Sequence, residues 1–200
     1  EGDRASLKRV KSLLDLLKMK YYITSGNHET KWSESGATDF GHIFGSDRFK
    51  FEYNGILFLG FNSGPVIRMA DGHVSPQDIS WMKKELATFG KDKPVILVTH
   101  YPLQEGDVDN WYDVTDAVRP YNIRAFLGGH YHRNLLFNYD GIPGIICRSN
   151  LRGKEKVGGY SVFEVTPDSL LVYEQKIGNE PEKWASYSLR KSYYNSDDYG

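Results

Sequence analysis

Four of the six histidines in this chain of 200 residues follow short apolar runs. Asn27 and His28 follow the first run, His100 follows the second, and His130 and His132 follow the third. Because ligands bind outside the carboxyl ends of strands in open α/β sheets, these side chains are predicted to converge on one pocket. Imidazole nitrogens and an amide oxygen, without cysteine, suit zinc, manganese, iron or nickel.

Each motif has a plainer interpretation when it is taken alone. His100 could be a packed histidine at the end of a strand, and His130 and His132 could be ordinary surface residues. Asn27 could serve only the turn, because asparagine tolerates left-handed backbone. Their joint occurrence at three strand ends favours a shared pocket. The other two histidines lie in glycine-rich loops and are interpreted as surface residues.

Hydrophobic spacing predicts the elements that position these residues. The expected elements are a helix at 6–18, a strand at 19–24, an irregular loop at 31–47, a hairpin at Asn54-Gly55, a helix from Ser75 to Phe89, a strand at 94–99, a short helix near 113–119, a strand at 123–127, and hairpins at Asp140-Gly141 and at 167–169. Strand–helix alternation followed by hairpins predicts an α/β fold, a layered sandwich of mixed β-sheets flanked by helices. Residues 1–178 are expected to form one domain, and 179–200 an irregular tail rich in Tyr and Ser.

The composition excludes several classes of protein. Hydrophobic residues make up 40% and aromatic residues 14% of the chain, which is typical of a globular domain. The net charge of −1 gives no case for a nucleic-acid or membrane-surface binder. Cys147 is the single cysteine, so no internal disulfide or cysteine-based zinc motif is possible. The sequence contains no run of about 18 apolar residues, so it predicts no membrane span. The composition fits a bacterial envelope protein and a cytoplasmic one equally, so the localisation stays open.

Three motifs, taken in order, resemble those of a known family. They are Gly26-Asn27-His28-Glu29, then Thr99-His100 at a strand end, then Gly129-His130-Tyr131-His132. This ordered set is similar to the later motifs of the calcineurin-like metallophosphoesterases, and the resemblance covers roughly residues 6 to 175. It implies a metallophosphoesterase-like fold and hydrolysis of phosphate esters by a metal-activated water.

The resemblance also implies a metal centre. Asn27, His100 and His130 would bind one divalent ion, and His132 would bind a second. Two metals about 4 Å apart can hold a phosphoryl group and lower the pKa of a shared water. Manganese, iron, zinc and nickel are not distinguished by these residues.

Other residues of the motifs would serve the substrate. His28 would contact the phosphate and assist the leaving oxygen, with Glu29 orienting its ring, while Tyr131 and Arg133 would contact a ligand or the substrate. The substrate could be a phosphorylated small molecule, a nucleotide or a phosphoprotein, and a monoester is not distinguished from a diester.

This sequence departs from the family pattern at its start. That pattern begins with strands that end in Asp-x-His and in Gly-Asp, and no such strand is predicted before Asn27. Asp15 lies within the predicted first helix, and no strand precedes Asp3. We therefore expect the N-terminal strands of the fold to be missing from this chain, and an upstream segment or another chain to complete it. Three functions remain open: part of a two-metal hydrolase, an inactive binding module of the same fold, and a single-metal binding protein.

Overall fold

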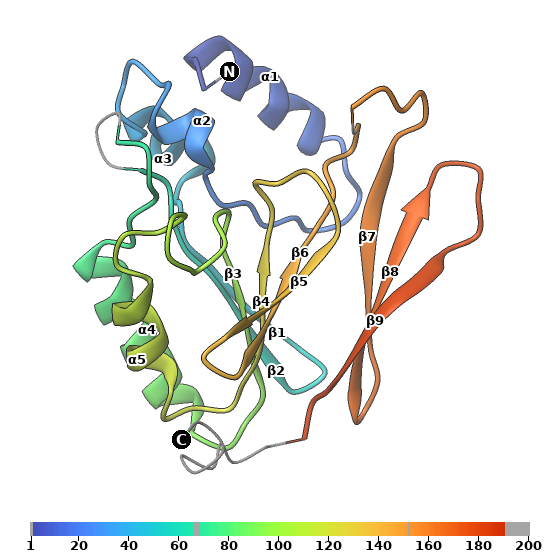
Figure 1. Ribbon diagram of the computed structural model, residues 1–200. Coiled ribbons are helices and arrows are strands. Elements are labelled where there is room, and N and C mark those ends of the chain that lie inside the picture. Colours follow the sequence, from blue (N-terminus) through green and yellow to red (C-terminus); the bar gives the residue numbers. More distant parts are fainter. Residues whose placement is uncertain (1, 66–68, 152, 191–200) are drawn as a thin grey trace.

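The computed structural model describes residues 2–65, 69–151 and 153–190, which form two stacked β-sheets with helices outside the larger one (Figure 1). The larger sheet has the strand order β1-β2-β3-β4-β6-β5, and the smaller has the order β7-β8-β9. The predicted α/β sandwich with a mixed sheet is confirmed. The strands are β1 (Phe49–Tyr53), β2 (Ile56–Gly60), β3 (Val95–Val98), β4 (Ile123–Gly128), β5 (Leu135–Tyr139), β6 (Ile142–Ile146), β7 (Gly159–Val165), β8 (Ser169–Lys176) and β9 (Glu182–Ser188). The helices are α1 (Arg4–Leu14), α2 (Asn27–Thr30), α3 (Thr38–Phe44), α4 (Pro76–Phe89) and α5 (Trp111–Val118).

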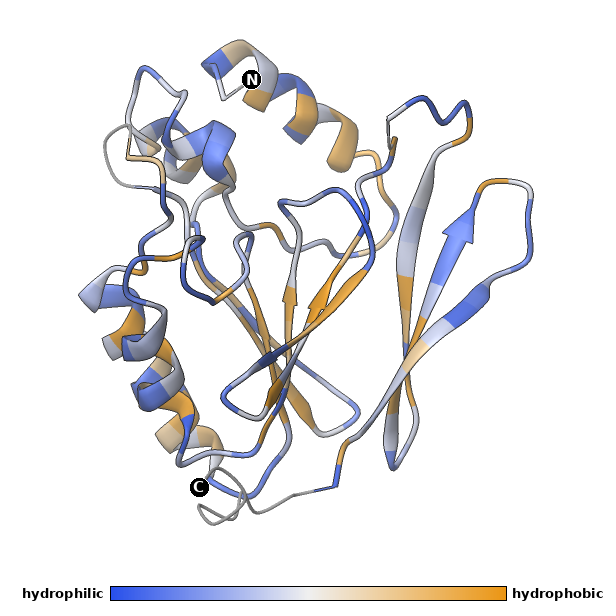
Figure 2. Cartoon of the chain, viewed as in Figure 1, coloured by the Kyte–Doolittle hydropathy of each residue, from blue (hydrophilic) through white to orange (hydrophobic). Residues whose placement is uncertain are grey.

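The larger sheet is covered on both faces. Since alternate residues of a strand point to opposite faces, the side chains of both sets are buried. One face packs on α4 and α5, whose Met82 and Val114 are fully buried. The other face packs on the smaller sheet, which contributes Leu170 and Val172. Hydrophobic residues accordingly gather along the central strands (Figure 2). Strands covered on both faces read as continuous apolar runs, as the sequence of β2 and β3 does.

Strands β2, β3, β4 and β6 run parallel, so their carboxyl ends lie at one edge of the sheet. Hydrogen bonds continue the β3–β4 pairing beyond the strands, from Thr99 N to Leu127 O (2.9 Å) and from Gly129 N to His100 O (2.9 Å). This continuation fixes the segments that follow β3 and β4 against each other. In Figure 1 the short helix α2 lies at the same end of the sheet.

Turn and cap residues explain where several elements begin and end. Asn54-Gly55 and Asp140-Gly141 both have positive φ at each residue, which is the backbone of tight hairpin turns. Both predicted hairpins are present, as β1–β2 and β5–β6. The Ser75 hydroxyl accepts a hydrogen bond from Asp78 N and caps α4, as its sequence predicts.

The segment 19–24 was predicted to be a strand and is not one. It forms no ladder with any described strand, and side chains hold it instead. Tyr22 stacks on Phe51 with ring centroids 4.4 Å apart, and the Thr24 hydroxyl donates to Phe61 O at 2.9 Å. An apolar run alone cannot supply the partner strand that a ladder requires.

Three other segments differ from the sequence prediction, and the first is 31–47, which was expected to be an irregular loop and contains helix α3. The first helix spans Arg4–Leu14 rather than 6–18, because the Asp3 carboxylate caps it by accepting from Ser6 N at 2.9 Å. The segment from 179, expected to be irregular, contains β9, which pairs with β8 in antiparallel register. The rest of that segment, 191–200, and residue 1 lie outside the described residues. No helix in the described part of the chain is long and apolar enough to cross a membrane.

Candidate metal centre

Asn27, His100 and His130 come together from three separate segments of the chain. Asn27 begins α2, His100 follows β3, and His130 follows β4. The amide oxygen Asn27 Oδ1 lies 2.9 Å from His100 Nε2, and the rings of His100 and His130 meet edge to face with centroids 5.3 Å apart. The three donors that the sequence predicted to converge are therefore neighbours.

Two glycines leave room for the His100 ring. A Cβ atom added at Gly26 would lie 3.1 Å from three ring atoms of His100, and one added at Gly129 would lie 3.6 Å from its Nδ1. The ring is thus held between two backbone segments that carry no side chain. The tight contact at Gly26 explains the glycine before Asn27, whereas the 3.6 Å at Gly129 is an ordinary contact distance.

The electrostatic surroundings favour neutral imidazoles. The pKa of His100 is lowered to about 4, chiefly by burial and also by the neighbouring histidines His130, His132 and His28. Burial also lowers the pKa of His130, against an opposing effect of the Asp107 carboxylate. Neutral imidazole is the form that binds a metal ion.

His28 and His132 lie at the exposed rim of this cluster. Both act on the pKa of His100, which places them near its ring. His28 follows Asn27 in the first turn of α2, so the two side chains diverge by about 100° around the helix axis. His132 is exposed and has the left-handed φ of 57°.

The remaining predicted residues have different surroundings. The Glu29 carboxylate accepts a hydrogen bond from Gly26 N at 2.9 Å, so it caps α2 rather than orienting the His28 ring as predicted. The Tyr131 hydroxyl donates to the Asp107 carboxylate. Arg133 is exposed.

Sequence reasoning missed three neighbours of this cluster. The Tyr101 ring lies 4.1 Å from the His130 ring between centroids, and Asp107 is buried beside Tyr131 with 6% of its surface exposed. Asn134 follows the histidines and connects them to the second sheet. Tyr101 could have been identified because it is next to His100 in the sequence. Asp107 lies in an irregular loop whose sequence shows no hydrophobic periodicity.

The positions of these donor atoms can be compared with the geometry that a divalent ion requires. Bonds of about 2.1 Å at right angles place two ligand atoms roughly 3 Å apart, which the 2.9 Å between Asn27 Oδ1 and His100 Nε2 satisfies. This distance fits Asn27 and His100 as neighbouring ligands of one ion, and the adjacent His130 ring is the candidate for a third ligand. No three His, Cys, Asp or Glu side chains of residues 2–65, 69–151 and 153–190 form a metal-binding group. A second ion therefore has only His132 among the predicted ligands, and the residues do not fit it.

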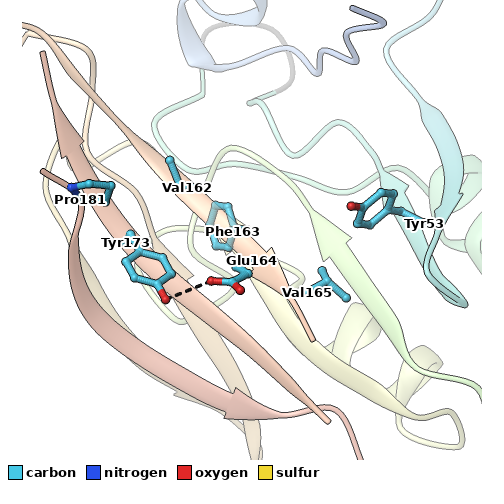
Figure 3. A pocket seen from close by; sticks show the side chains of 7 residues that line it. All are labelled: Tyr53, Val162, Phe163, Glu164, Val165, Tyr173 and Pro181. Atoms are coloured by element: carbon cyan, nitrogen blue, oxygen red, sulfur yellow. Dashed lines mark hydrogen bonds between the residues drawn. The ribbon is translucent and has the colours of Figure 1, made fainter. Parts of the chain in front are cut away.

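A separate hollow of about 570 Å³ lies far from these histidines in the fold. It is lined by Tyr53, by residues of β7 and by Tyr173 (Figure 3). Its lining is mixed, with apolar side chains and the hydrogen-bonded pair of Tyr173 and Glu164. The chemistry-bearing side chains and this hollow are distinct features.

Comparison with known proteins places the chain in a family and supports its fold. Residues 2–134 match the model of the calcineurin-like phosphoesterases, and the chain belongs to this family of phosphoester hydrolases. It is 29% identical to the YvnB protein of Bacillus subtilis (strain 168) over 220 residues, which cover 96% of this chain and 16% of that protein. It is 27% identical to the serine/threonine-protein phosphatase CPPED1 of Rattus norvegicus over 161 residues, covering 70% of this chain and 50% of that protein. The chain thus spans half or less of these two relatives.

A solved structure shares the fold. The dimetal phosphatase from Danio rerio superimposes with a TM-score of 0.64 at 14% identity, over 94% of this chain and 77% of that one. This likeness supports the two-sheet architecture.

Proposed function

We propose that this chain takes part in the hydrolysis of phosphate esters and holds one divalent ion through Asn27, His100 and His130. The observation that carries the proposal is the 2.9 Å approach of Asn27 Oδ1 to His100 Nε2, within a family of phosphoester hydrolases. When bound, the ion supplies positive charge for phosphoryl oxygens and activates water. The chain's own residues supply the oriented donors.

His28 is the proposed proton donor to the leaving oxygen. It is exposed beside Asn27 and diverges from it, so it can face a phosphoryl group while Asn27 faces the ion. An imidazole is a common general acid and can donate a proton to a departing alkoxide.

The substrate is a phosphorylated small molecule, a nucleotide or a phosphoprotein. The printed name of the rat relative, a serine/threonine-protein phosphatase, makes a phosphoserine peptide the first peptide to test. The aryl monoester p-nitrophenyl phosphate and the corresponding diester separate the two ester classes. Specificity is expected in the loops rather than in the sheets.

This chain alone is expected to be a poor catalyst. Only His132 is proposed for a second ion, and the Asp3 carboxylate caps α1. One ion in place of two removes several kcal/mol of transition-state stabilisation, and each tenfold in rate corresponds to about 1.4 kcal/mol. We expect hydrolysis at least roughly a thousandfold below that of a two-ion site, with recovery when a polypeptide carrying the Asp-x-His and Gly-Asp motifs is supplied.

Metal titration tests the proposal directly. Calorimetry with Mn²⁺ or Co²⁺ should give one ion per chain, and His100→Ala should remove most of the affinity. An unaltered affinity in His100→Ala, or no binding by the unsubstituted chain, would contradict the metal site. Binding of one ion, with no hydrolysis even after the missing motifs are supplied, would instead favour a single-metal binding protein.

A leaving-group series tests His28 separately. With the missing motifs supplied, His28→Ala should lower turnover strongly at unchanged metal content. The loss should be smaller for p-nitrophenyl phosphate than for alkyl esters, because p-nitrophenolate needs little protonation. Equal losses for both ester types would rule out proton donation by His28.

A further inference from the structure

The loop at 129–134, here called the histidine loop, has an unusual backbone. His130 has φ of 65° and His132 has φ of 57°, so two residues with side chains adopt the left-handed conformation within three positions. Such a conformation costs roughly 1–2 kcal/mol per residue relative to ordinary backbone, and somewhat less for histidine. It persists only when contacts around the segment determine it. The structure contains two such contacts, one within the loop and one at its end.

The first contact joins Tyr131 to Asp107. The Tyr131 hydroxyl lies 2.8 Å and 2.7 Å from the two carboxylate oxygens, and Gln104 Nε2 donates to the same carboxylate at 2.8 Å. The Asp107 backbone is itself fixed, because its carbonyl accepts from Gly72 N at 2.7 Å. Tyr131 lies between the two histidines in the sequence, and its hydroxyl is therefore hydrogen-bonded to a buried residue whose backbone is also hydrogen-bonded.

The second contact joins Asn134 to the smaller sheet. Asn134 Oδ1 accepts from Arg148 N at 3.1 Å, and Asn134 Nδ2 donates to Glu174 Oε2 on β8 at 3.0 Å. The Arg148 side chain is fully buried and pairs with Glu174 and Glu155. The end of the histidine loop is thus held by an ionic network in which Arg148 pairs with two carboxylates.

We propose that Tyr131 and Asn134 are positioning residues that hold the histidine loop so that His130 keeps its ligand geometry. The inference rests on the proposed metal site. Metal–ligand distances must hold within about 0.2 Å, which a loop of six residues cannot guarantee by itself. Tyr131 acts from within the loop through Asp107, and Asn134 acts from its end through Arg148 and Glu174. Loss of such supporting contacts typically weakens metal affinity 10- to 100-fold.

Two substitutions and a matched control test this role. Tyr131→Phe removes only the hydroxyl that reaches Asp107, and Asn134→Ala removes the connection to the smaller sheet. Tyr173→Phe is the control, because the Tyr173 hydroxyl also donates to a carboxylate, Glu164 Oε2 at 3.1 Å, and this pair lines a separate hollow (Figure 3). All three variants keep the buried core unchanged.

Cobalt binding supplies the first readout. Co²⁺ affinity should fall about 10- to 100-fold in Tyr131→Phe and Asn134→Ala, and stay unchanged in Tyr173→Phe. The visible absorption of bound Co²⁺ reports ligand geometry, so its bands should shift in the two loop variants alone. Wild-type affinity and an unshifted spectrum in both loop variants would overturn the proposal.

Hydrogen exchange of the metal-free chain supplies the second readout and separates two failures. The amides of Gly129 and Tyr131 donate to His100 O at 2.9 Å and to Gly129 O at 2.7 Å, so they report on the loop. Their exchange should speed up in Tyr131→Phe and Asn134→Ala but not in Tyr173→Phe. If the unsubstituted chain binds no Co²⁺, the proposed function fails. In that case the hydrogen-exchange rates alone test whether Tyr131 and Asn134 hold the loop. Unchanged rates in both loop variants would refute this role.

Discussion

Gly26→Ala should weaken metal binding through a purely steric effect on His100. The Gly26 backbone has φ of −114° and ψ of −170°, which alanine adopts without strain. The added Cβ would lie 3.1 Å from the Cγ, Nδ1 and Cε1 atoms of the His100 ring. The ring also packs edge to face against His130, with centroids 5.3 Å apart, so it is not free to move independently.

The geometry sets the expected magnitude. The ring must shift by a few tenths of an ångström to relieve the contact, which exceeds the tolerance of about 0.2 Å for a metal ligand. We expect about tenfold weaker Mn²⁺ or Co²⁺ binding, equivalent to about 1.4 kcal/mol. The free energy of unfolding of the metal-free chain should fall by only about 1 kcal/mol, a modest overpacking effect.

Gly41→Ala is the matched control, because a Cβ at Gly41 in α3 meets nothing within 4 Å. It should leave metal affinity unchanged and raise the free energy of unfolding by about 0.4–1 kcal/mol. Titration calorimetry and urea denaturation of both variants provide the measurements. Wild-type affinity in Gly26→Ala, or an equal loss in Gly41→Ala, would refute the steric reasoning.

Three further predictions concern stability and reactivity. Arg148→Met leaves the Glu155 and Glu174 carboxylates without their buried cation and should lower the free energy of unfolding by about 3 kcal/mol. Arg190→Met removes one partner of an exposed ion pair and should leave the urea midpoint unchanged. Met82→Ala opens a cavity at a fully buried site of α4 and should cost about 3 kcal/mol in urea denaturation, unlike Met69→Ala at a site that is 47% exposed. Burial raises the pKa of the Cys147 thiol, so its thiolate is scarcer at pH 8. Its reaction with a disulfide reagent should be slower in the folded chain than in urea, and equal rates would contradict the burial argument.

The meeting of His100 and His130 could be predicted from the sequence, because parallel strands place their carboxyl ends at one edge of a sheet. Each residue follows an apolar run that is continuous rather than alternating, which is the pattern of strands buried on both faces. Asn27 was placed correctly for a different reason. It was expected at the end of a strand at 19–24, and it begins a short helix instead.

The contacts that surround the histidines could not be predicted in the same way. Asp107 and Tyr131 meet across two irregular loops, and Asn134 reaches Glu174 from 40 positions away. Such contacts depend on side-chain directions in loops. Loop sequences show no hydrophobic periodicity from which these directions could be predicted. The strand β9 was missed because its sequence, EKWASYS, alternates only weakly and depends on pairing with β8.

The metal centre also constrains the order of events during synthesis of the chain. Asn27 and His100 are separated by 73 positions, and His130 comes later still. At about 5–20 residues per second, a ribosome takes roughly 5 to 20 seconds to proceed from Asn27 to His130. During that interval the first donor has no partners, because β3 and β4 have not yet paired. In the proposed site, ion uptake would therefore require β3 and β4 to have paired, and a nascent chain that stops before the histidine loop would lack the ligand His130.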